Sequence, residues 1–176
     1  MNLPFAESIP GGIRDILPFL AAALLHEAGH ILACVLLHVP LRFFRLHSAG
    51  AVIGYDASRL SYPAEALIAA AGPLAGFLGA AAVLGKRGHS SFLFGTASLA
   101  LSLFNLLPIP PMDGGMILSA LLRMRFEEDR CARILFAVRR AGTVLMWLLA
   151  VTLQLRCGGN LSLLIISVFL LVRLTE

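Results

Sequence analysis

The sequence predicts an all-α membrane protein: a polytopic helix bundle of four or five transmembrane helices, with a small membrane-associated β-hairpin after the first helix. Three observations support this fold class. Of the 176 residues, 59% are hydrophobic and only 14% are charged, whereas a soluble domain is about one quarter charged. The mean hydropathy is +0.87. Several apolar runs approach or exceed the roughly 20 residues that a helix needs to cross the hydrocarbon core.

The apolar runs divide the chain into the expected helices. The first covers residues 16–39, with Asp15 placed as its N-cap and Pro40 directly after it. The others cover residues 64–84, residues 91–107, a stretch that ends near residue 155, and residues 161–172. The last run has only 12 residues, so its length fits a re-entrant or interfacial piece as well as a short span. We expect one membrane-embedded domain over residues 1–176.

The segment after the first apolar run, residues 41–57, differs in composition from the expected helices. It begins LRFFRLHSAGAVIGYD, is rich in aromatic and β-branched residues, and has glycines at positions 50 and 54. Such residues favour strands, and glycine favours a tight turn between them. The composition therefore predicts a β-hairpin.

Arginine and lysine are unevenly distributed between the two sides of the expected bundle. Ten of the 14 lie on the side of the hairpin and residues 108–133, and four lie on the other side. Since positive residues favour the cytoplasmic side, we expect the hairpin and the C-terminus of this multi-pass cell-membrane protein in the cytoplasm. The arginine-rich residues 123–140 fit a face attracted to anionic lipid or, alternatively, a docking surface for a membrane regulator. No nucleic-acid partner is expected.

The first apolar run contains the pentapeptide HEAGH at residues 26–30. His26 and His30 are four residues apart and therefore lie on one face of a helix, one turn apart. Two imidazoles at this spacing can bind one zinc ion, while Glu27 can approach a water molecule at the metal; this is the HExxH pattern of zinc hydrolases. Ionisable side chains inside a membrane span are functional by default. The alternative is a pair of buried histidines bonded to neighbouring helices.

A catalytic zinc site needs three protein ligands and one open position, so a third ligand must come from another segment. The candidate is Asp113 in NLLPIPPMDGGMIL. Three prolines before it cannot sustain helical hydrogen bonds, and Gly114 and Gly115 permit a tight turn behind it. Irregular backbone at membrane depth is tolerated only within protein or along a cavity, which suits a broken helix that delivers one carboxylate. The alternative is an ordinary loop aspartate after a proline-terminated helix.

Three motifs together make the sequence similar to a known family. HEAGH in one span, AAGPLAG at residues 70–76 in the next and NLLPIPPMDGG at residues 105–115 after a third resemble, in order and spacing, the site-2 protease family (peptidase family M50) of intramembrane zinc metalloproteases. The resemblance covers about residues 16–120, the expected catalytic core, and leaves C-terminal helices at about residues 134–172. Within the family, the chain is similar to the compact branch that processes a sporulation pro-sigma factor and has a hairpin in the same place.

The resemblance implies one Zn²⁺ ion per chain, bound by His26, His30 and Asp113, with Glu27 as the general base. Glu27 would take a proton from water and return it to the leaving amine. The oxyanion of the tetrahedral intermediate needs a hydrogen-bond donor, and Asn105 is the candidate. The alternative for Asn105 is a helix-end side chain that bonds freed backbone near the prolines.

Two features concern the substrate. Many members of the family carry an asparagine where this chain has Gly76, so the resemblance carries no substrate contact over to this position. An unpaired strand of the hairpin can receive an extended substrate by β-augmentation. The alternative is a hairpin that only packs on the lipid surface.

The sequence therefore predicts an intramembrane zinc endopeptidase that cuts membrane-anchored or membrane-associated proteins near the cytoplasmic face. The alternatives are a non-catalytic zinc-binding scaffold of the same fold and a metal transporter. Glu27 argues against the scaffold, since a metal site without catalysis does not need a carboxylate beside its histidine ligand. The scarcity of ionisable residues in the other spans argues against the transporter.

Overall fold

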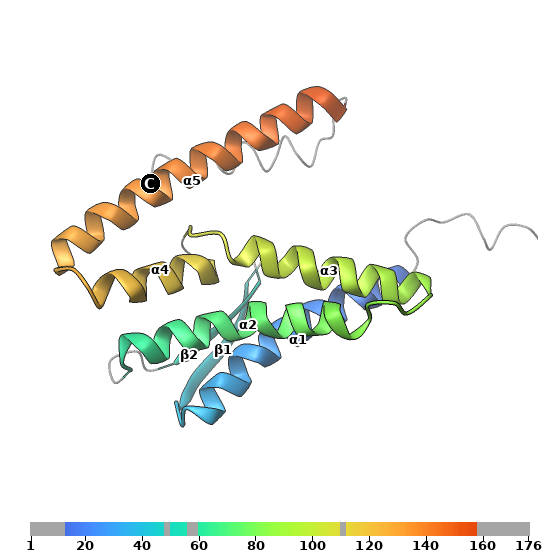
Figure 1. Ribbon diagram of the computed structural model, residues 1–176, viewed down its shortest axis with the longest axis horizontal. Coiled ribbons are helices and arrows are strands. Elements are labelled where there is room, and N and C mark those ends of the chain that lie inside the picture. Colours follow the sequence, from blue (N-terminus) through green and yellow to red (C-terminus); the bar gives the residue numbers. More distant parts are fainter. Residues whose placement is uncertain (1–12, 48–49, 56–59, 110–111, 158–176) are drawn as a thin grey trace, which may run out of the picture.

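The structure, a computed structural model, describes residues 13–47, 50–55, 60–109 and 112–157. Within these ranges it contains five helices and two strands, labelled in Figure 1. In chain order they are α1 (Ile13–Leu36), β1 (Leu41–His47), β2 (Gly50–Tyr55), α2 (Tyr62–Ala82), α3 (His89–Asn105), α4 (Asp113–Arg123) and α5 (Glu128–Cys157). The last predicted apolar run, residues 161–172, lies outside the described residues.

Helices α1, α2 and α3 form a bundle in which each packs against the other two, and α4 packs against α2 (Figure 1). Small side chains dominate its centre: the most buried apolar residues there are Ala22, Cys34, Ile68, Ala69 and Ala120. Glycines let the backbones approach closely. A side chain at Gly29 of α1 would collide with the backbone of Ala71 in α2, and one at Gly79 of α2 would collide with Leu25 in α1. The small residues of AAAGPLAGFLGAAA in α2 thus serve close helix packing, as small residues typically do between membrane helices.

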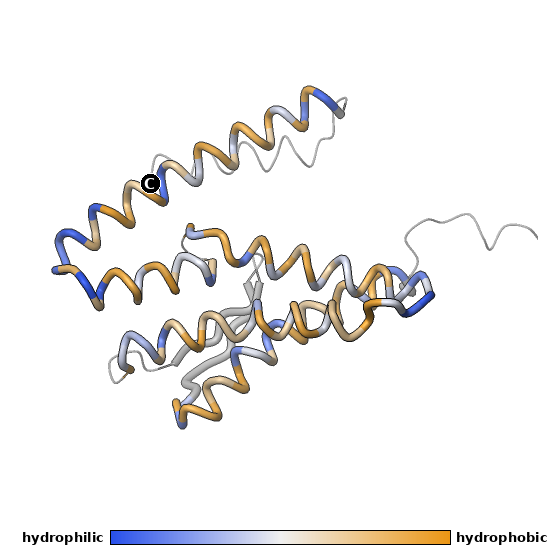
Figure 2. Tube along the Cα trace, viewed as in Figure 1, coloured by the Kyte–Doolittle hydropathy of each residue, from blue (hydrophilic) through white to orange (hydrophobic). Residues whose placement is uncertain are grey.

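In the described part of the chain, three helices are long and apolar enough to cross a bilayer: Asp15–Leu36, Tyr62–Ala82 and Glu128–Arg156. Large hydrophobic side chains cover their outer faces, for example Leu24 (70% exposed), Leu78 (71%) and Leu145 (67%). Figure 2 shows apolar residues along most of the length of these helices. Such extensive apolar surface suits lipid rather than water. Helix α3, at 17 residues, is shorter, so the number of four or five spans stays a prediction.

Two helix starts differ from the sequence-based expectation. Helix α1 begins at Ile13, so Asp15 lies within its first turn and the prediction that it is the N-cap is wrong. Helix α5 is continuous from Glu128, ahead of the C-terminal helices expected from about residue 134. In both cases, acidic residues in the first turn suit the positive end of the helix dipole, so charge does not mark the helix boundary.

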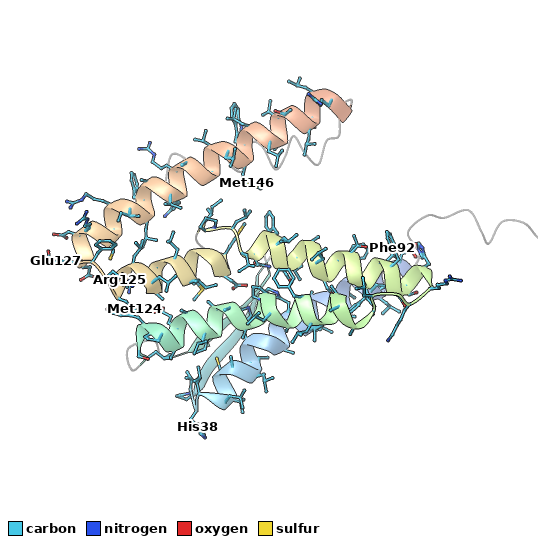
Figure 3. All side chains as sticks on the ribbon, in the orientation of Figure 1. His38, Phe92, Met124, Arg125, Glu127 and Met146 are labelled. Carbon is cyan, nitrogen blue, oxygen red and sulfur yellow. The ribbon has the colours of Figure 1, made fainter. Side chains whose placement is uncertain are left out.

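Helix α1 ends in a motif that contains one residue with left-handed backbone conformation, His38. His38 has φ 55°, and its N–H donates to the carbonyl of Val35, while the N–H of Val39 donates to the carbonyl of Cys34. This pair of bonds is the Schellman motif, in which glycine is the usual left-handed residue. Figure 3 shows His38 at the outer end of α1, away from the rest of the bundle.

Strands β1 and β2 form an antiparallel pair, with His47 opposite Gly50 next to the turn. They occupy the segment for which the sequence predicts a hairpin. The register shifts between Leu41 and Phe43, which marks a bulge. No third strand pairs with the sheet in the described part of the chain, so each strand has one unpaired backbone edge. The association of this sheet with the membrane stays a prediction.

Candidate metal centre

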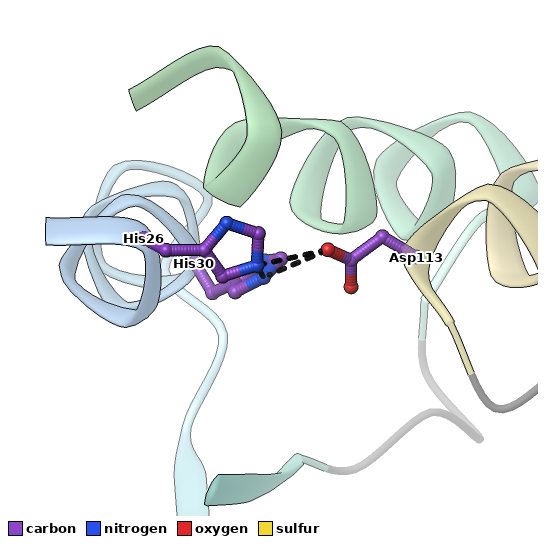
Figure 4. Close-up of side chains that lie close together, drawn as sticks. All are labelled: His26, His30 and Asp113. Carbon is purple, nitrogen blue, oxygen red and sulfur yellow. Dashed lines mark hydrogen bonds and ion pairs between the residues drawn. The ribbon is translucent and has the colours of Figure 1, made fainter. Parts of the chain in front are cut away.

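Three side chains from two distant segments meet at the centre of the bundle (Figure 4). His26 and His30 come from the middle of α1, and Asp113 is the first residue of α4. Asp113 Oδ2 lies 3.0 Å from His26 Nε2 and 3.4 Å from His30 Nε2, and the two Nε2 atoms are 3.3 Å apart. His26 is only 4% exposed. Within the described residues, this is the one group of three histidine, cysteine or acidic side chains whose ligand atoms converge.

Hydrogen bonds alone do not account for this convergence. His30 Nδ1 donates a hydrogen bond to the carbonyl of Ile68 at 2.8 Å, so in the neutral imidazole its Nε2 carries a lone pair and no proton. At most one hydrogen, that of a neutral His26, then remains for three short contacts, and Nδ1 of His26 is itself buried without a partner in the described part of the chain. Asp113 Oδ2 is buried and has no hydrogen-bond partner of acceptable geometry in the described part of the chain. A cation between the three atoms would satisfy all of them at once.

The distances suit zinc. With metal–ligand bonds of roughly 2.0–2.1 Å and tetrahedral angles, ligand atoms lie about 3.3 Å apart. The three observed separations are 3.0, 3.3 and 3.4 Å. Two imidazoles and one carboxylate also match the donor set of catalytic zinc sites, which leave a fourth position open. The residues present therefore fit a zinc ion.

Helix α2 holds the second histidine in place. The carbonyl of Ile68 accepts the Nδ1 proton of His30, an arrangement that fixes the ring orientation and leaves Nε2 for a metal. Gly72, one turn further along α2, lies directly against the His30 ring, and a Cβ at this position would collide with the imidazole. The sequence alone did not connect either residue with the ligands, because AAGPLAG served only as one of the motifs of the family resemblance.

Asp113 reaches the site because α3 ends and a separate helix begins. Helix α3 stops at Asn105, and the N–H of Ile109 then donates to the carbonyl of Leu107 in a tight turn. Gly114 lies against the backbone carbonyls of Leu106 and Leu107, where a Cβ would not fit. The predicted tight turn at Gly114 and Gly115 is wrong: both lie inside α4. Close backbone approach is what requires glycine at position 114.

The loop before Asp113 also contacts α5. A side chain at Gly142 of α5 would collide with the side chain of Ile109, so Ile109 packs directly on the α5 backbone. The segment that leads to Asp113 therefore contacts the backbone of α5, while Gly114 behind Asp113 lies against the residues that directly follow α3.

The other two predicted site residues, Glu27 and Asn105, do not belong to the group of converging ligand atoms. Glu27 is half-buried on α1, next to His26. Asn105 is half-buried at the end of α3, and its Nδ2 donates to the carbonyl of Leu101 at 3.1 Å. This bond fits the helix-end alternative and leaves one of the two Nδ2 hydrogens for another acceptor. Cys34 continues the His26–His30 face but is fully buried and does not belong to the ligand cluster.

Gly76, where many site-2 proteases carry asparagine, lies against α3. A Cβ at Gly76 would collide with Oγ of Ser102, and this hydroxyl donates to the carbonyl of Ser98 at 2.8 Å. Both serines are fully buried. The space that a larger side chain would need is therefore filled from the neighbouring helix.

Comparison with known proteins gives two matches. The model of a family described as peptidase family M50 matches residues 85–149, a range that includes Asp113 but not the two histidines. Among solved structures, the chain is similar to the site-2 protease from Methanocaldococcus jannaschii, with 25% sequence identity and a TM-score of 0.67; the match covers 89% of this chain and 74% of that one. No curated protein sequence matches.

Together, these matches support the assignment of the chain to the site-2 protease family and to the membrane metalloproteases. The three apolar helices agree with a multi-pass membrane protein. Neither comparison separates the sporulation branch from the others, and that part of the resemblance stays a prediction.

Proposed function

We propose that the chain is an intramembrane zinc endopeptidase with one metal-dependent site, held by His26, His30 and Asp113. The observation that carries this proposal is the convergence of two Nε2 atoms and one carboxylate oxygen within 3.0–3.4 Å of one another. A bound Zn²⁺ ion would supply Lewis-acid polarisation of a peptide carbonyl and activation of a water molecule. The similarity to peptidase family M50 and to a solved site-2 protease structure supports the protease class.

The roles of two further residues belong to this proposal. Glu27 follows His26 on α1 and is half-buried; we assign it the general base, which takes a proton from water and returns it to the leaving amine. Asn105 is assigned the donor to the oxyanion, through the Nδ2 hydrogen that the Leu101 carbonyl does not use.

The proposed substrate is a membrane-anchored or membrane-associated protein, cut near the cytoplasmic face. A peptide bond within a helix is hidden by its own hydrogen bonds, so the cleaved segment must be extended. The unpaired backbone edges of β1 and β2 offer main-chain donors and acceptors to such a segment. A pro-sigma factor is the particular substrate that the branch resemblance suggests. If a candidate pro-sigma factor stays full length when co-expressed with this protein, that substrate is ruled out.

The test pairs zinc content with cleavage of a single-span substrate in detergent for wild type and Glu27→Gln. The account predicts one zinc per chain in both proteins and a loss of cleavage of at least about 100-fold in the variant. Glu128→Gln is the matched control: it removes the same charge from an exposed position in the first turn of α5 and should cut like wild type.

Two other results would redirect the proposal. Cleavage by Glu27→Gln at the wild-type rate would show that another group is the base. Zinc in both proteins with no cleavage of any membrane substrate offered would favour the non-catalytic zinc-binding scaffold.

A further inference from the structure

The end of α4 and the first turns of α5 form an arginine-rich corner, residues 123–140. It contains six arginines, Arg123, Arg125, Arg130, Arg133, Arg139 and Arg140, against three acidic residues, Glu127, Glu128 and Asp129. All nine are exposed. Figure 2 shows the hydrophilic colour concentrated where α4 meets α5, and Figure 3 shows Arg125 and Glu127 at the outer tip of this corner.

The guanidinium groups of the corner are available to an external anion. Among the residues that the structure describes, none of the six forms an ion pair with a carboxylate. Two of them stack on aromatic rings instead: Arg130 lies 4.9 Å from the ring centre of Phe126 and Arg140 lies 5.2 Å from that of Phe136. A stacked guanidinium keeps the N–H groups at its edges free to donate.

The length of α5 places the corner at the membrane surface. Its 30 residues extend about 45 Å, whereas the hydrocarbon core is about 30 Å thick. No charged residue occurs in the 15 residues between Arg140 and Arg156. These residues extend about 22 Å, so a core of about 30 Å would reach only a few residues beyond each arginine, and the long arginine side chains can extend to the headgroups. The residues before Arg140 then project into the headgroup layer, together with the exposed ring of Phe136 (57% exposed).

Arg133, Phe136 and Arg140 share one face of α5, since at 3.6 residues per turn they fall within about 60° of one another. The acidic residues 127–129 lie at the start of the helix, where the helix dipole favours them. Arginine binds phosphate oxygens in a bidentate manner. Trp147, which is half-buried, falls on the same face two turns further into the membrane.

We propose that this face of α5 binds an anionic phospholipid, with the phosphate held by Arg133 and Arg140 and an acyl chain running along the helix past Trp147. The binding is independent of any cleavage by the metal centre.

The single tryptophan of the chain supplies the test. The full-length protein is reconstituted in bilayers of phosphatidylcholine that contain increasing fractions of a lipid brominated in its acyl chains, either phosphatidylglycerol or phosphatidylcholine. Brominated phosphatidylglycerol should quench Trp147 fluorescence at a mole fraction about tenfold lower than brominated phosphatidylcholine does, since arginines near an anionic surface each favour binding.

Paired variants separate this site from a general charge effect. R133Q/R140Q should lose the preference for the anionic lipid, whereas K86Q/R87Q, which removes two exposed charges from the loop between α2 and α3, should retain it. Circular dichroism of each variant checks that the helices persist. Equal quenching by both lipids in wild type, or a preference that survives R133Q/R140Q, would overturn the proposal. Loss of the preference in K86Q/R87Q, or on addition of inorganic phosphate at constant ionic strength, would overturn it as well.

Discussion

The imidazole of His30 occupies the space that a side chain on Gly72 would need. Helix α2 therefore presents only backbone atoms, at Gly72, to one side of the His30 ring. The carbonyl of Ile68 on the same helix accepts the hydrogen bond from His30 Nδ1. The position of His30 depends on α2 as much as on α1.

Gly72→Ala should displace the His30 ring and lower zinc affinity by about 10- to 100-fold, the usual effect of disturbing a group that orients a ligand. Zinc titration against a competing chelator measures the change. Gly95→Ala is the control for crowding between helices, because its methyl would also collide with a neighbour, the side chain of Val83, but this neighbour is not a ligand of the metal centre. Wild-type affinity in Gly72→Ala would show that the ring can move without consequence.

Gly114→Ala should destabilise the protein by about 1–3 kcal/mol, in the range of overpacked sites, and should also weaken zinc binding. The added methyl would meet the backbone carbonyls of Leu106 and Leu107, and backbone cannot yield by rotating a side chain. The whole loop before Asp113 must then shift. Thermal unfolding and zinc titration of the same preparation measure both effects, and a stable variant with unaltered affinity would contradict this packing.

Asn105→Ala separates the two roles that remain for this residue. If the free Nδ2 hydrogen stabilises the oxyanion, as we propose, kcat should fall by about 10²–10³ while zinc content and thermal stability stay near wild type. Steady-state cleavage kinetics provide the measurement. A drop in stability with unchanged kcat would assign Asn105 to the helix end alone, through its bond to Leu101.

His38→Gly should stabilise the protein by about 0.5–1 kcal/mol. Left-handed backbone strains an L-residue by roughly 1–2 kcal/mol, and glycine removes this strain from the folded state. Glycine also makes the unfolded chain more flexible, which offsets part of the stabilisation. The expected readout is a higher Tm with unchanged zinc content, because His38 is exposed and distant from the ligands. Leu37→Gly, one residue earlier, should not raise the Tm.

Much of the candidate site could be predicted from the sequence because its chemistry is local. The four-residue spacing of His26 and His30 fixes two ligands on one helix face, and prolines beside an aspartate mark where a helix must break. The structure brings these three side chains together. Ionisable residues are so rare in the apolar segments that the few present can be assigned to one common site from the sequence.

The features that support the ligands could not be predicted in this way, because they are contacts between segments. Gly72 and Gly114 look alike in the sequence: each could serve a turn, a packing contact or a flexible joint. Only the arrangement of α2 against α1, and of α4 against the end of α3, shows that both glycines exclude a side chain. The early start of α5 was also hidden, since its first turns are charged and lack the apolar signal of a span.

The most direct test of the central claim is zinc X-ray absorption spectroscopy of the full chain purified in detergent and loaded with one equivalent of metal. We predict a site of two imidazole nitrogens and oxygen ligands at about 2.0–2.2 Å with no sulfur, and the loss of one imidazole in His30→Ala. A zinc–sulfur distance of about 2.3 Å, which would bring in Cys34, or a spectrum unchanged by His30→Ala, would contradict it.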